Sequence, residues 1–440
     1  EYRLSAKSTA LEYAGEHIGG ALWQYFEGQG DAERALAAMK DASRYTRGHL
    51  SRDAVHALYG GAVTLSASRM DMARSCHFAY FMRYGLKARE RTGAGFDAPQ
   101  IGTFVHDVME HTLRQAKECG GLHTLSKDKL HALVRASIEE YIDRVLPDLC
   151  EKSARFRYLF NRLCATVERI MDEVSEELQS SDFEPLAFEL EFGADGQLPA
   201  ITIREENGTA RVVGKVDRVD GWLHDGKLYL RVVDYKTGKK SFDLAELRYG
   251  LGLQMLLYLF TLKEEGQMLF GGHEIVPAGV LYTPAREPML RCARDTEPET
   301  IEKALKKELR RSGMVLEDPA VLQAMEHSAL ESPCYLPIAV KRDGAVTGSL
   351  ASAEQLGKLS KYVDYILHEI TQEVFAGNID ADPYARTPQQ SACTYCEFAS
   401  ACHFENGCGS DRMEYIKATK NDEFWQYIDE VNGEGAHENG

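Results

Sequence analysis

The spacing of apolar residues predicts that the first part of the chain is helical. Residues 1–62 carry apolar positions at helical intervals, which indicates several short amphipathic helices but too little chain for a complete domain. The same spacing predicts longer helices at four places, residues 66–85, 102–115, 124–147 and 153–180. We expect Ser66 or Ser68 to cap the first of these, and the last two to form a helical insert within about residues 112–185.

The pattern then changes to an alternation of apolar and polar residues, which predicts β-strands. Strands are expected at residues 186–192, 211–223, 228–235 and 274–282, and an apolar helix at 250–262. A helix, three strands, a helix and a strand in this order predict an α/β fold with a mixed-sheet core flanked by helices. Helices follow at 301–311 and 352–377, and the acidic, glycine-rich end after Trp425 is expected to fray.

Two strands of this core bring a pair of carboxylates together. Asp225-Gly226 is typical of a two-residue type I′ turn, in which both residues have positive φ. With this turn as the loop, Asp217 lies directly opposite Asp234. Like charges in opposite positions repel each other, so the pair favours a divalent cation that takes both carboxylates as ligands. The alternative is that both side chains are solvated on an edge hairpin.

The same register predicts the roles of the neighbouring charged residues. Lys236 is on the same face of its strand as Asp234 and is placed to hold or activate a water near the metal. Lys215 falls opposite Lys236 and is a weaker candidate for that role. On the other face, Asp220 falls opposite Arg231, which predicts a structural ion pair.

Composition and charge exclude some classes of function. The 440 residues are 44% hydrophobic, which suffices for a sizeable core, and their formal net charge is −17. A protein that coats nucleic acid would be basic overall, whereas a DNA enzyme needs only a local basic groove. Candidate residues for such a groove are Arg83, Lys87, Arg89, Arg91, Lys236, Lys239, Lys240, Lys303, Lys306, Lys307, Arg310 and Arg311.

Targeting and nucleotide-binding motifs are missing from the sequence. We find no signal-peptide pattern and no apolar run of about 18 residues, and therefore expect a soluble cytoplasmic protein, without membrane contact, that is a fragment of a longer chain. There is no G-x-x-x-x-G-K-[ST] motif, so ATP hydrolysis by a P-loop is not expected.

Three of the ten cysteines are spaced as metal ligands. Cys393, Cys396 and Cys402 form a C-x2-C-x5-C pattern, which indicates metal ligation in a chain without a secretion signal. A fourth ligand is needed. Cys408 would complete a local zinc site, whereas the distant Cys76 would complete a split iron–sulfur site. The remaining cysteines are expected to be buried apolar residues, namely Cys119, Cys150, Cys164, Cys292 and Cys334.

Four segments of the sequence resemble, in their order, the RecB-type motifs of the PD-(D/E)XK nuclease superfamily. They are G-T-F-V-H (102–106), V-G-K-V-D-R-V-D (213–220), V-V-D-Y-K-T-G (232–238) and Q-M-L-L-Y (254–258). The resemblance implies that Lys236 is the catalytic lysine, and that Gln254 and Tyr258, one helical turn apart, contact the substrate or support the lysine. The metal ligands that it implies are His106, Asp217, Asp234 and the backbone carbonyl of Tyr235.

The chemistry of phosphodiester cleavage agrees with these residue types. Negative charge develops on the attacking and leaving oxygens, and one or two metal ions can stabilise both. Carboxylates favour Mg²⁺ or Mn²⁺ over a soft metal. Glu189 and Glu191 on the preceding strand are candidates for further acidic groups of the site.

A longer segment, S-A-S-R-M-D-M-A-R-S-C-H-F-A-Y-F-M-R-Y-G-L-K-A-R-E-R (66–91), resembles the AddB-type subunit of helicase–nuclease complexes, as does H-A-L-Y-G-G (56–61). The resemblance implies a [4Fe–4S] cluster that closes the nuclease domain and takes Cys76 as the ligand upstream of the trio. His77 stands where the family usually has proline. The cluster ligands implied are Cys76, Cys393, Cys396 and Cys402.

The resemblance also implies a domain organisation and a partner. Residues 1–62 would be the end of an upstream helicase-like region, 63–408 the nuclease domain and 409–440 a tail. The chain would work with an AddA-type helicase–nuclease subunit on DNA ends and single-stranded DNA, in the resection of double-strand breaks for recombinational repair. Two alternatives are a free-standing CRISPR-associated RecB-family exonuclease and a non-catalytic scaffold that binds DNA ends.

Overall fold

The computed structural model describes residues 4–43, 46–89, 98–193, 196–293, 295–387 and 389–438. Its centre is a six-stranded mixed sheet with the strand order β11-β8-β7-β6-β5-β2. The strands of this sheet are β2 (Glu184–Phe192), β5 (Gly214–His224), β6 (Lys227–Lys236), β7 (Glu274–Pro284), β8 (Ser312–Leu316) and β11 (Leu350–Ala351). Strands β6 and β7 are parallel, so their carboxyl ends meet at one edge of the sheet.

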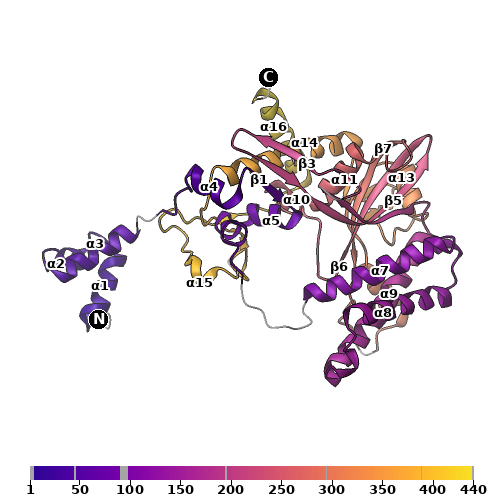
Figure 1. Ribbon diagram of the computed structural model, residues 1–440, viewed down its shortest axis with the longest axis horizontal. Coiled ribbons are helices and arrows are strands. Elements are labelled where there is room, and N and C mark those ends of the chain that lie inside the picture. The colour runs from indigo at the N-terminus through magenta and orange to yellow at the C-terminus, as the bar shows by residue number, and fades with distance from the viewer. Residues whose placement is uncertain are drawn as a thin grey trace.

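Long helices cover both faces of the sheet, as Figure 1 shows. The helices on one face are α7 (Ala98–Glu118), α8 (Lys127–Val145) and α9 (Ala154–Gln179). The helices on the other face are α11 (Gln254–Glu265) and α14 (Ala353–Phe375). Apolar residues of the strands and of both helical layers form one continuous core. The predicted α/β fold with helices flanking a mixed sheet is confirmed.

A smaller sheet corrects the prediction of one long strand at residues 211–223. The chain leaves strand β4 (Gly208–Val212) and enters β5 at Gly214, and β4 belongs to a second sheet with β1 (Ala62–Leu65) and β3 (Ile201–Glu205). A Cβ atom at Gly214 would lie 2.4 Å from the ring of Phe192 and 2.6 Å from that of Tyr258. The close approach of these rings explains the glycine at the crossing point.

The helix predicted at 66–85 is interrupted at Cys76. Helix α5 (Ala67–Ser75) ends there because Cys76 has an extended backbone, with φ −174° and ψ 121°. The chain continues as α6 (His77–Tyr80) and a π-helical turn (Phe81–Gly85). The backbone N–H of His77 donates to Asp382 at 2.9 Å. This contact with a residue far along the chain stabilises a break that helical periodicity does not reveal.

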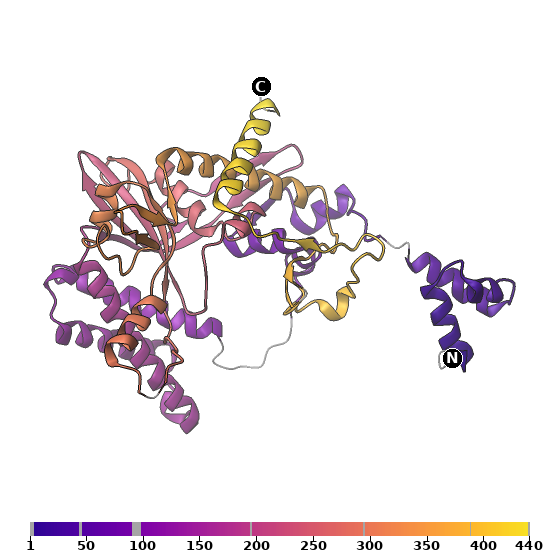
Figure 2. The same ribbon diagram turned by 180° about the vertical axis from the view of Figure 1, so that it is seen from behind.

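Helices lie toward both ends of the described part of the chain. Helices α1 (Lys7–Glu16), α2 (Ala21–Phe26) and α3 (Asp31–Ser43) pack on a small core of their own, at one end of the molecule in Figures 1 and 2. Helix α16 (Asn421–Glu438) lies against α14 and buries Phe424 and Ile428 completely. The prediction that this end frays was wrong, because its apolar side chains find a partner surface on α14.

The remaining elements are short and connect this framework. Helix α11 begins at Gln254 rather than at Gly250, because Gly250 and Gly252 adopt positive φ angles of 73° and 68°. The remaining helices are α4 (Arg52–Tyr59), the 3₁₀ turns Leu122–Thr124 and Leu149–Glu151, α10 (Leu244–Arg248), α12 (Pro298–Glu308), α13 (Pro319–Met325) and α15 (Ala399–Cys402). The remaining strands are β9 (Ile338–Val340), β10 (Val346–Gly348), β12 (Tyr384–Thr387), β13 (Gln390–Ser391) and β14 (Glu414–Tyr415). Among the described residues, no helix is long and apolar enough to cross a membrane.

The β5–β6 hairpin has the predicted turn and register. Asp225 and Gly226 have φ angles of 49° and 77°, as a type I′ turn requires. Asp220 pairs with Arg231 in the ladder, and the Arg231 Nε atom lies 2.9 Å from an Asp220 carboxylate oxygen. The predicted cross-strand ion pair is confirmed.

This ion pair belongs to a buried charge network under the hairpin. Glu177 of α9 is 2% exposed and lies 2.5 Å from Arg311 and 3.3 Å from Arg231. Arg218 forms an ion pair with Asp220 at 2.8 Å. Burial opposes the charged form of Glu177, but the charges of Arg311, Arg231 and Arg218 outweigh it and lower the pKa of Glu177 to about 2. The network joins α9 to β5 and β6.

Replacing Glu177 tests the contribution of this network. Glu177→Gln keeps the side chain's size but removes the charge that three arginines face, so we expect the free energy of unfolding at pH 7 to fall by about 3–5 kcal/mol. The carboxylate contribution is complete above the ordinary glutamate pKa of 4.5 and is lost as the pH falls toward 2. Urea denaturation should therefore show a difference that shrinks between these pH values. The control is Glu176→Gln, at the exposed neighbouring residue. An equal loss of unfolding free energy in this variant would contradict the role assigned to Glu177.

Candidate functional site

A histidine from the helical layer contacts the β5–β6 hairpin of the central sheet. His106 of α7 donates from Nε2 to the backbone carbonyl of Tyr235 at 2.9 Å, and its Nδ1 lies 3.4 Å from Oδ2 of Asp217. The same Asp217 oxygen accepts a hydrogen bond from the Tyr235 N–H at 2.9 Å. Burial disfavours a charged His106, but its hydrogen bond to Asp217 and the Asp217 charge outweigh burial and raise the pKa of His106 to about 9. Three of the predicted ligand residues are therefore in mutual contact.

Two carboxylates, one buried and one half-buried, occupy this end of the hairpin. The ladder between the strands extends to the pair Arg218 and Val233, so Asp217 and Asp234 take the next positions on β5 and β6. Asp234 is 3% exposed, and burial together with the nearby Asp217 charge raises the pKa of Asp234 to about 6. The alternative of two solvated carboxylates on an edge hairpin is wrong. A site with two neighbouring like charges, one of them buried, is one that a cation would stabilise.

The predicted lysine faces one of these carboxylates. The Nζ atom of Lys236 lies 2.7 Å from Oδ2 of Asp234. Lys215, the weaker candidate, forms an ion pair with Glu189 at 2.5 Å instead. The Gln254 side chain donates to the Tyr258 hydroxyl at 3.2 Å, and both residues line a hollow of about 670 Å³ together with Lys215. Glutamine and tyrosine thus border an open space beside the carboxylates.

The donor atoms fit a hard divalent cation. Ligand atoms of His106, Glu189 and Asp217 all lie within 4.8 Å of one another. Carboxylate oxygens, a carbonyl oxygen and one imidazole nitrogen suit Mg²⁺ or Mn²⁺, whereas zinc in structural sites takes cysteine and histidine. The donor chemistry therefore agrees with the prediction of Mg²⁺ or Mn²⁺.

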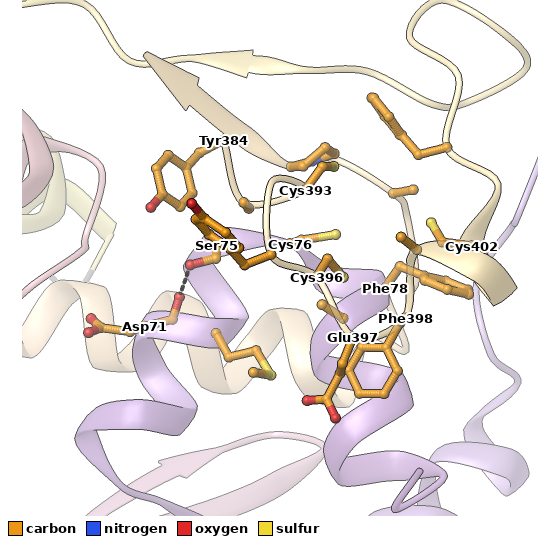
Figure 3. Close-up of a pocket in the computed structure, with 18 of the residues that line it drawn as sticks. Asp71, Ser75, Cys76, Phe78, Tyr384, Cys393, Cys396, Glu397, Phe398 and Cys402 are labelled. Atoms are coloured by element: carbon orange, nitrogen blue, oxygen red, sulfur yellow. Dashed lines mark hydrogen bonds between the residues drawn. The ribbon is translucent and has the colours of Figure 1, made fainter. Parts of the chain in front are cut away.

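The predicted cluster cysteines line one pocket, shown in Figure 3. Its volume is about 550 Å³, and its walls include Cys76 from the break between α5 and α6, and Cys393, Cys396 and Cys402 from the segment after β12. Cys408 is not among the described residues that line it. Burial raises the pKa of the Cys76 thiol to about 12. Four cysteine sulfur atoms around one pocket, with Cys76 buried and the other three half-buried, are a donor set for an iron–sulfur cluster, whose iron ions stabilise thiolates.

An upstream arginine holds this cysteine segment in place. The Nη2 atom of Arg47 donates to the backbone carbonyl of Cys402 at 2.8 Å, and its Nε atom forms an ion pair with Asp411 at 2.8 Å. The guanidinium also lies over the ring of Phe78, 4.5 Å from the ring centroid. Residues on either side of the nuclease motifs are thus joined next to the pocket.

Comparisons with known proteins agree with this geometry. Residues 64–403 match the PD-(D/E)XK nuclease superfamily. The chain belongs to this superfamily. It is 30% identical over 422 residues to the B-type subunit of the ATP-dependent helicase/deoxyribonuclease of Ruminiclostridium cellulolyticum, covering 94% of this chain and 36% of that protein. The protein of the same name from Acetivibrio thermocellus is 32% identical over 412 residues, covering 93% of this chain and 35% of that protein. The chain thus spans about a third of the length of these relatives.

One acidic residue that the four motifs do not mark lies beside the candidate site. Glu189 of β2 lies 4.0 Å from Nδ1 of His106, and its backbone has a positive φ of 48°. Such a conformation is strained for a glutamate and is typical of functional positions. Glu191, named with it as a candidate, has a 55% exposed side chain, and its carboxylate lies 3.7 Å from Nζ of Lys215. The backbone irregularity separates two glutamates that the sequence pattern treats alike.

Several other sequence-based assignments are corrected in this nuclease domain. The leftover cysteines are not buried: Cys119 and Cys292 are exposed, Cys164 and Cys334 are partly buried, and the Cys150 side chain lies outside the described residues. Among the residues predicted to form a basic groove, Arg91 lies outside the described residues. Arg311 is buried with Glu177 rather than lining a groove. Lys303 and Lys306 are exposed and paired with acids on their own helix.

The two glutamates of β2 provide a matched test of metal binding. We expect Glu189→Gln to weaken Mn²⁺ binding at least about tenfold, since even outer partners of metal ligands contribute about 10–100-fold. Glu191→Gln removes the same charge from an exposed position and should leave the affinity unchanged. Titration calorimetry with Mn²⁺ measures both, with melting temperatures as the check on folding. Equal Mn²⁺ affinity in the two variants would rule out Glu189 as a ligand.

Proposed function

We propose that this chain is a divalent-metal-dependent DNA exonuclease domain. The observation that supports the proposal is the convergence of His106, Glu189 and Asp217, next to the Asp234–Lys236 ion pair, in a chain of the PD-(D/E)XK nuclease superfamily. The ligands are His106, Asp217, Asp234 and the Tyr235 carbonyl, with Glu189 as an additional one. When bound, Mg²⁺ or Mn²⁺ supplies a water of lowered pKa and stabilises charge on the phosphate.

The side chains of the site position the reacting groups. Lys236 holds the attacking water against Asp234, its partner at 2.7 Å. The Tyr235 carbonyl is fixed by the hydrogen bond from His106, and Asp217 by the bond from the Tyr235 N–H. Gln254 and Tyr258 contact the DNA strand in the hollow that they line. Hydrolysis of the phosphodiester follows without ATP.

We also propose that Cys76, Cys393, Cys396 and Cys402 hold a [4Fe–4S] cluster. The pocket that these residues line supports this set over a zinc site with Cys408. The link would close a loop of more than 300 residues around the nuclease core. By the loop-entropy relation for cross-links, such a closure stabilises the fold by roughly 5 kcal/mol.

The setting of the reaction follows from the relatives. Because the similar proteins are named as subunits of an ATP-dependent helicase/deoxyribonuclease, we propose that the chain acts within a helicase–nuclease complex that resects DNA ends for recombinational repair. An AddA-type subunit would supply the motor. The similarity extends over 94% of the chain, which favours this setting over a free-standing CRISPR-associated exonuclease.

Removing one carboxylate tests the nuclease activity. We expect the chain to degrade end-labelled single-stranded DNA with Mg²⁺ and without ATP, and Asp234→Asn to be at least about a hundredfold slower, because charge stabilisation at the phosphate is lost. Asp225→Asn, in the exposed turn of the same hairpin, is the control and should cut normally. An Asp234→Asn variant as fast as the wild type would refute the proposed site. A wild type that binds DNA but does not cut it would favour the non-catalytic scaffold.

Two cysteine variants test the cluster. After anaerobic reconstitution with iron and sulfide, Cys76→Ser should lose the brown visible absorption and bound iron, and should unfold at a lower urea concentration. Cys408→Ser should retain all three properties, because Cys408 is not among the pocket-lining residues. Loss of the absorption in Cys408→Ser, or stoichiometric zinc without colour in the wild type, would show that the ligand set is wrong.

A further inference from the structure

A second hollow lies beside Lys236, at the carboxyl ends of β6 and β7. Its volume is about 320 Å³, and it is bordered by Lys236, the loop that follows β6, the end of β7 and the start of β8. A hydrogen bond from the Ala285 N–H to the Lys236 carbonyl, at 2.9 Å, joins the ends of β7 and β6 at this place. In open α/β sheets, ligands bind at the carboxyl ends of the strands. The hollow thus adjoins the proposed reaction centre at the edge where a ligand is expected.

Cationic side chains dominate the walls of this hollow, which we call the basic hollow. Its charged lining residues are Lys236, Lys239, Lys240, Arg286, Arg310 and Glu308. Glu308, its single acid among the described lining residues, is shared by Arg286 at 2.8 Å and Lys239 at 3.3 Å. Asp234 and Glu246 contact Lys236 and Lys240 from outside the lining. Five cations thus face three acids, in a chain with a net charge of −17.

Two buried polar groups of the lining lack partners. Thr283 is 2% exposed, and its hydroxyl has no hydrogen-bond partner among the described residues. Arg310 donates to the carbonyls of Ile338 and Pro333, whereas its buried Nε–H has no acceptor in the same part of the chain. Buried donors without acceptors are rare and costly. A hydroxyl and a guanidinium N–H are both donors that a phosphate oxygen can satisfy.

We propose, on the basis of the nuclease function above, that the basic hollow is a phosphate subsite that binds a phosphate group of the DNA strand next to the one being cleaved. Thr283 and Arg310 donate to the phosphate oxygens, and Lys239, Lys240 and Arg286 provide the surrounding positive charge. The subsite fixes the register of the strand relative to Asp234 and Lys236, because phosphate contacts position a nucleic acid without reading its sequence. The phosphate is either an internal phosphodiester or a terminal 5′-monophosphate.

Binding of a fluorescent single-stranded oligonucleotide in EDTA tests the subsite without cleavage. Thr283→Val keeps the side chain's shape and loses no side-chain hydrogen bond to the described residues, so it should fold normally and raise the Kd about fivefold. Lys239→Ala combined with Lys240→Ala should raise the Kd roughly tenfold and reduce the salt dependence by about 0.7 for each phosphate that is no longer neutralised. Lys303→Ala combined with Lys306→Ala removes the same charge outside the hollow and should leave the Kd within twofold.

The oligonucleotide's end distinguishes the two phosphate sources. If the subsite takes a terminal monophosphate, a 5′-phosphorylated strand should bind more tightly than a 5′-hydroxyl strand, and Thr283→Val should remove that difference. If it takes an internal phosphodiester, both strands should bind equally and lose affinity equally in the variant. Inorganic phosphate should compete in either case, and less effectively in Thr283→Val.

The outcomes separate this proposal from the nuclease function. Cleavage by the wild type, with Thr283→Val and the Lys239 and Lys240 variant binding DNA as tightly as the wild type, would overturn the subsite and leave the nuclease intact. Weaker binding in both variants, with no cleavage by the wild type, would support the subsite and overturn the nuclease. No measurable oligonucleotide binding by the wild type would overturn the subsite.

Discussion

The β5–β6 hairpin is the constraint on which the rest of the structure depends. Its charged side chains are neutralised on one face, whereas carboxylates lie next to each other on the other face. On one face, Asp220 and Arg231 neutralise each other and join the network of Glu177. On the other face, Asp234 is buried beside the half-buried Asp217, and burial and the Asp217 charge raise the pKa of Asp234 to about 6. Because side chains alternate along a strand, one register fixes the structural face and the reactive face at once.

The site is completed by segments that approach the hairpin from different sides. Helix α7 contributes His106, and β2 contributes Glu189 through a backbone irregularity. The cysteine segment lines a separate pocket, and Arg47 donates a hydrogen bond to the Cys402 carbonyl there. A cluster at this position would hold the two flanks of the domain together, since Cys76 precedes the nuclease motifs and Cys393, Cys396 and Cys402 follow them.

Although the chain is acidic overall, cations outnumber acids around the basic hollow beside Lys236. A net charge of −17 repels DNA at long range, so binding must rely on local groups. The exposed lysines of α12 pair with glutamates on the same helix, such as Lys303 with Glu299. Around the basic hollow, by contrast, cations outnumber acids and Thr283 lacks a partner among the residues that the structure describes. The local excess of cations over acids, and not the net charge of the chain, therefore makes the basic hollow suited to a phosphate.

The sequence by itself determined the local features that short-range rules control. The Asp225-Gly226 turn, the opposition of Asp220 and Arg231, and the helical periods of α8, α9 and α14 follow from turn chemistry and side-chain alternation. Contacts between distant segments decided the rest. Asp382 stabilises the break at Cys76, the pairing of β4 with β1 and β3 divides the predicted strand, and the positive φ of Glu189 separates it from Glu191. Each of these depends on packing between residues remote in sequence, which periodicity along one segment cannot encode.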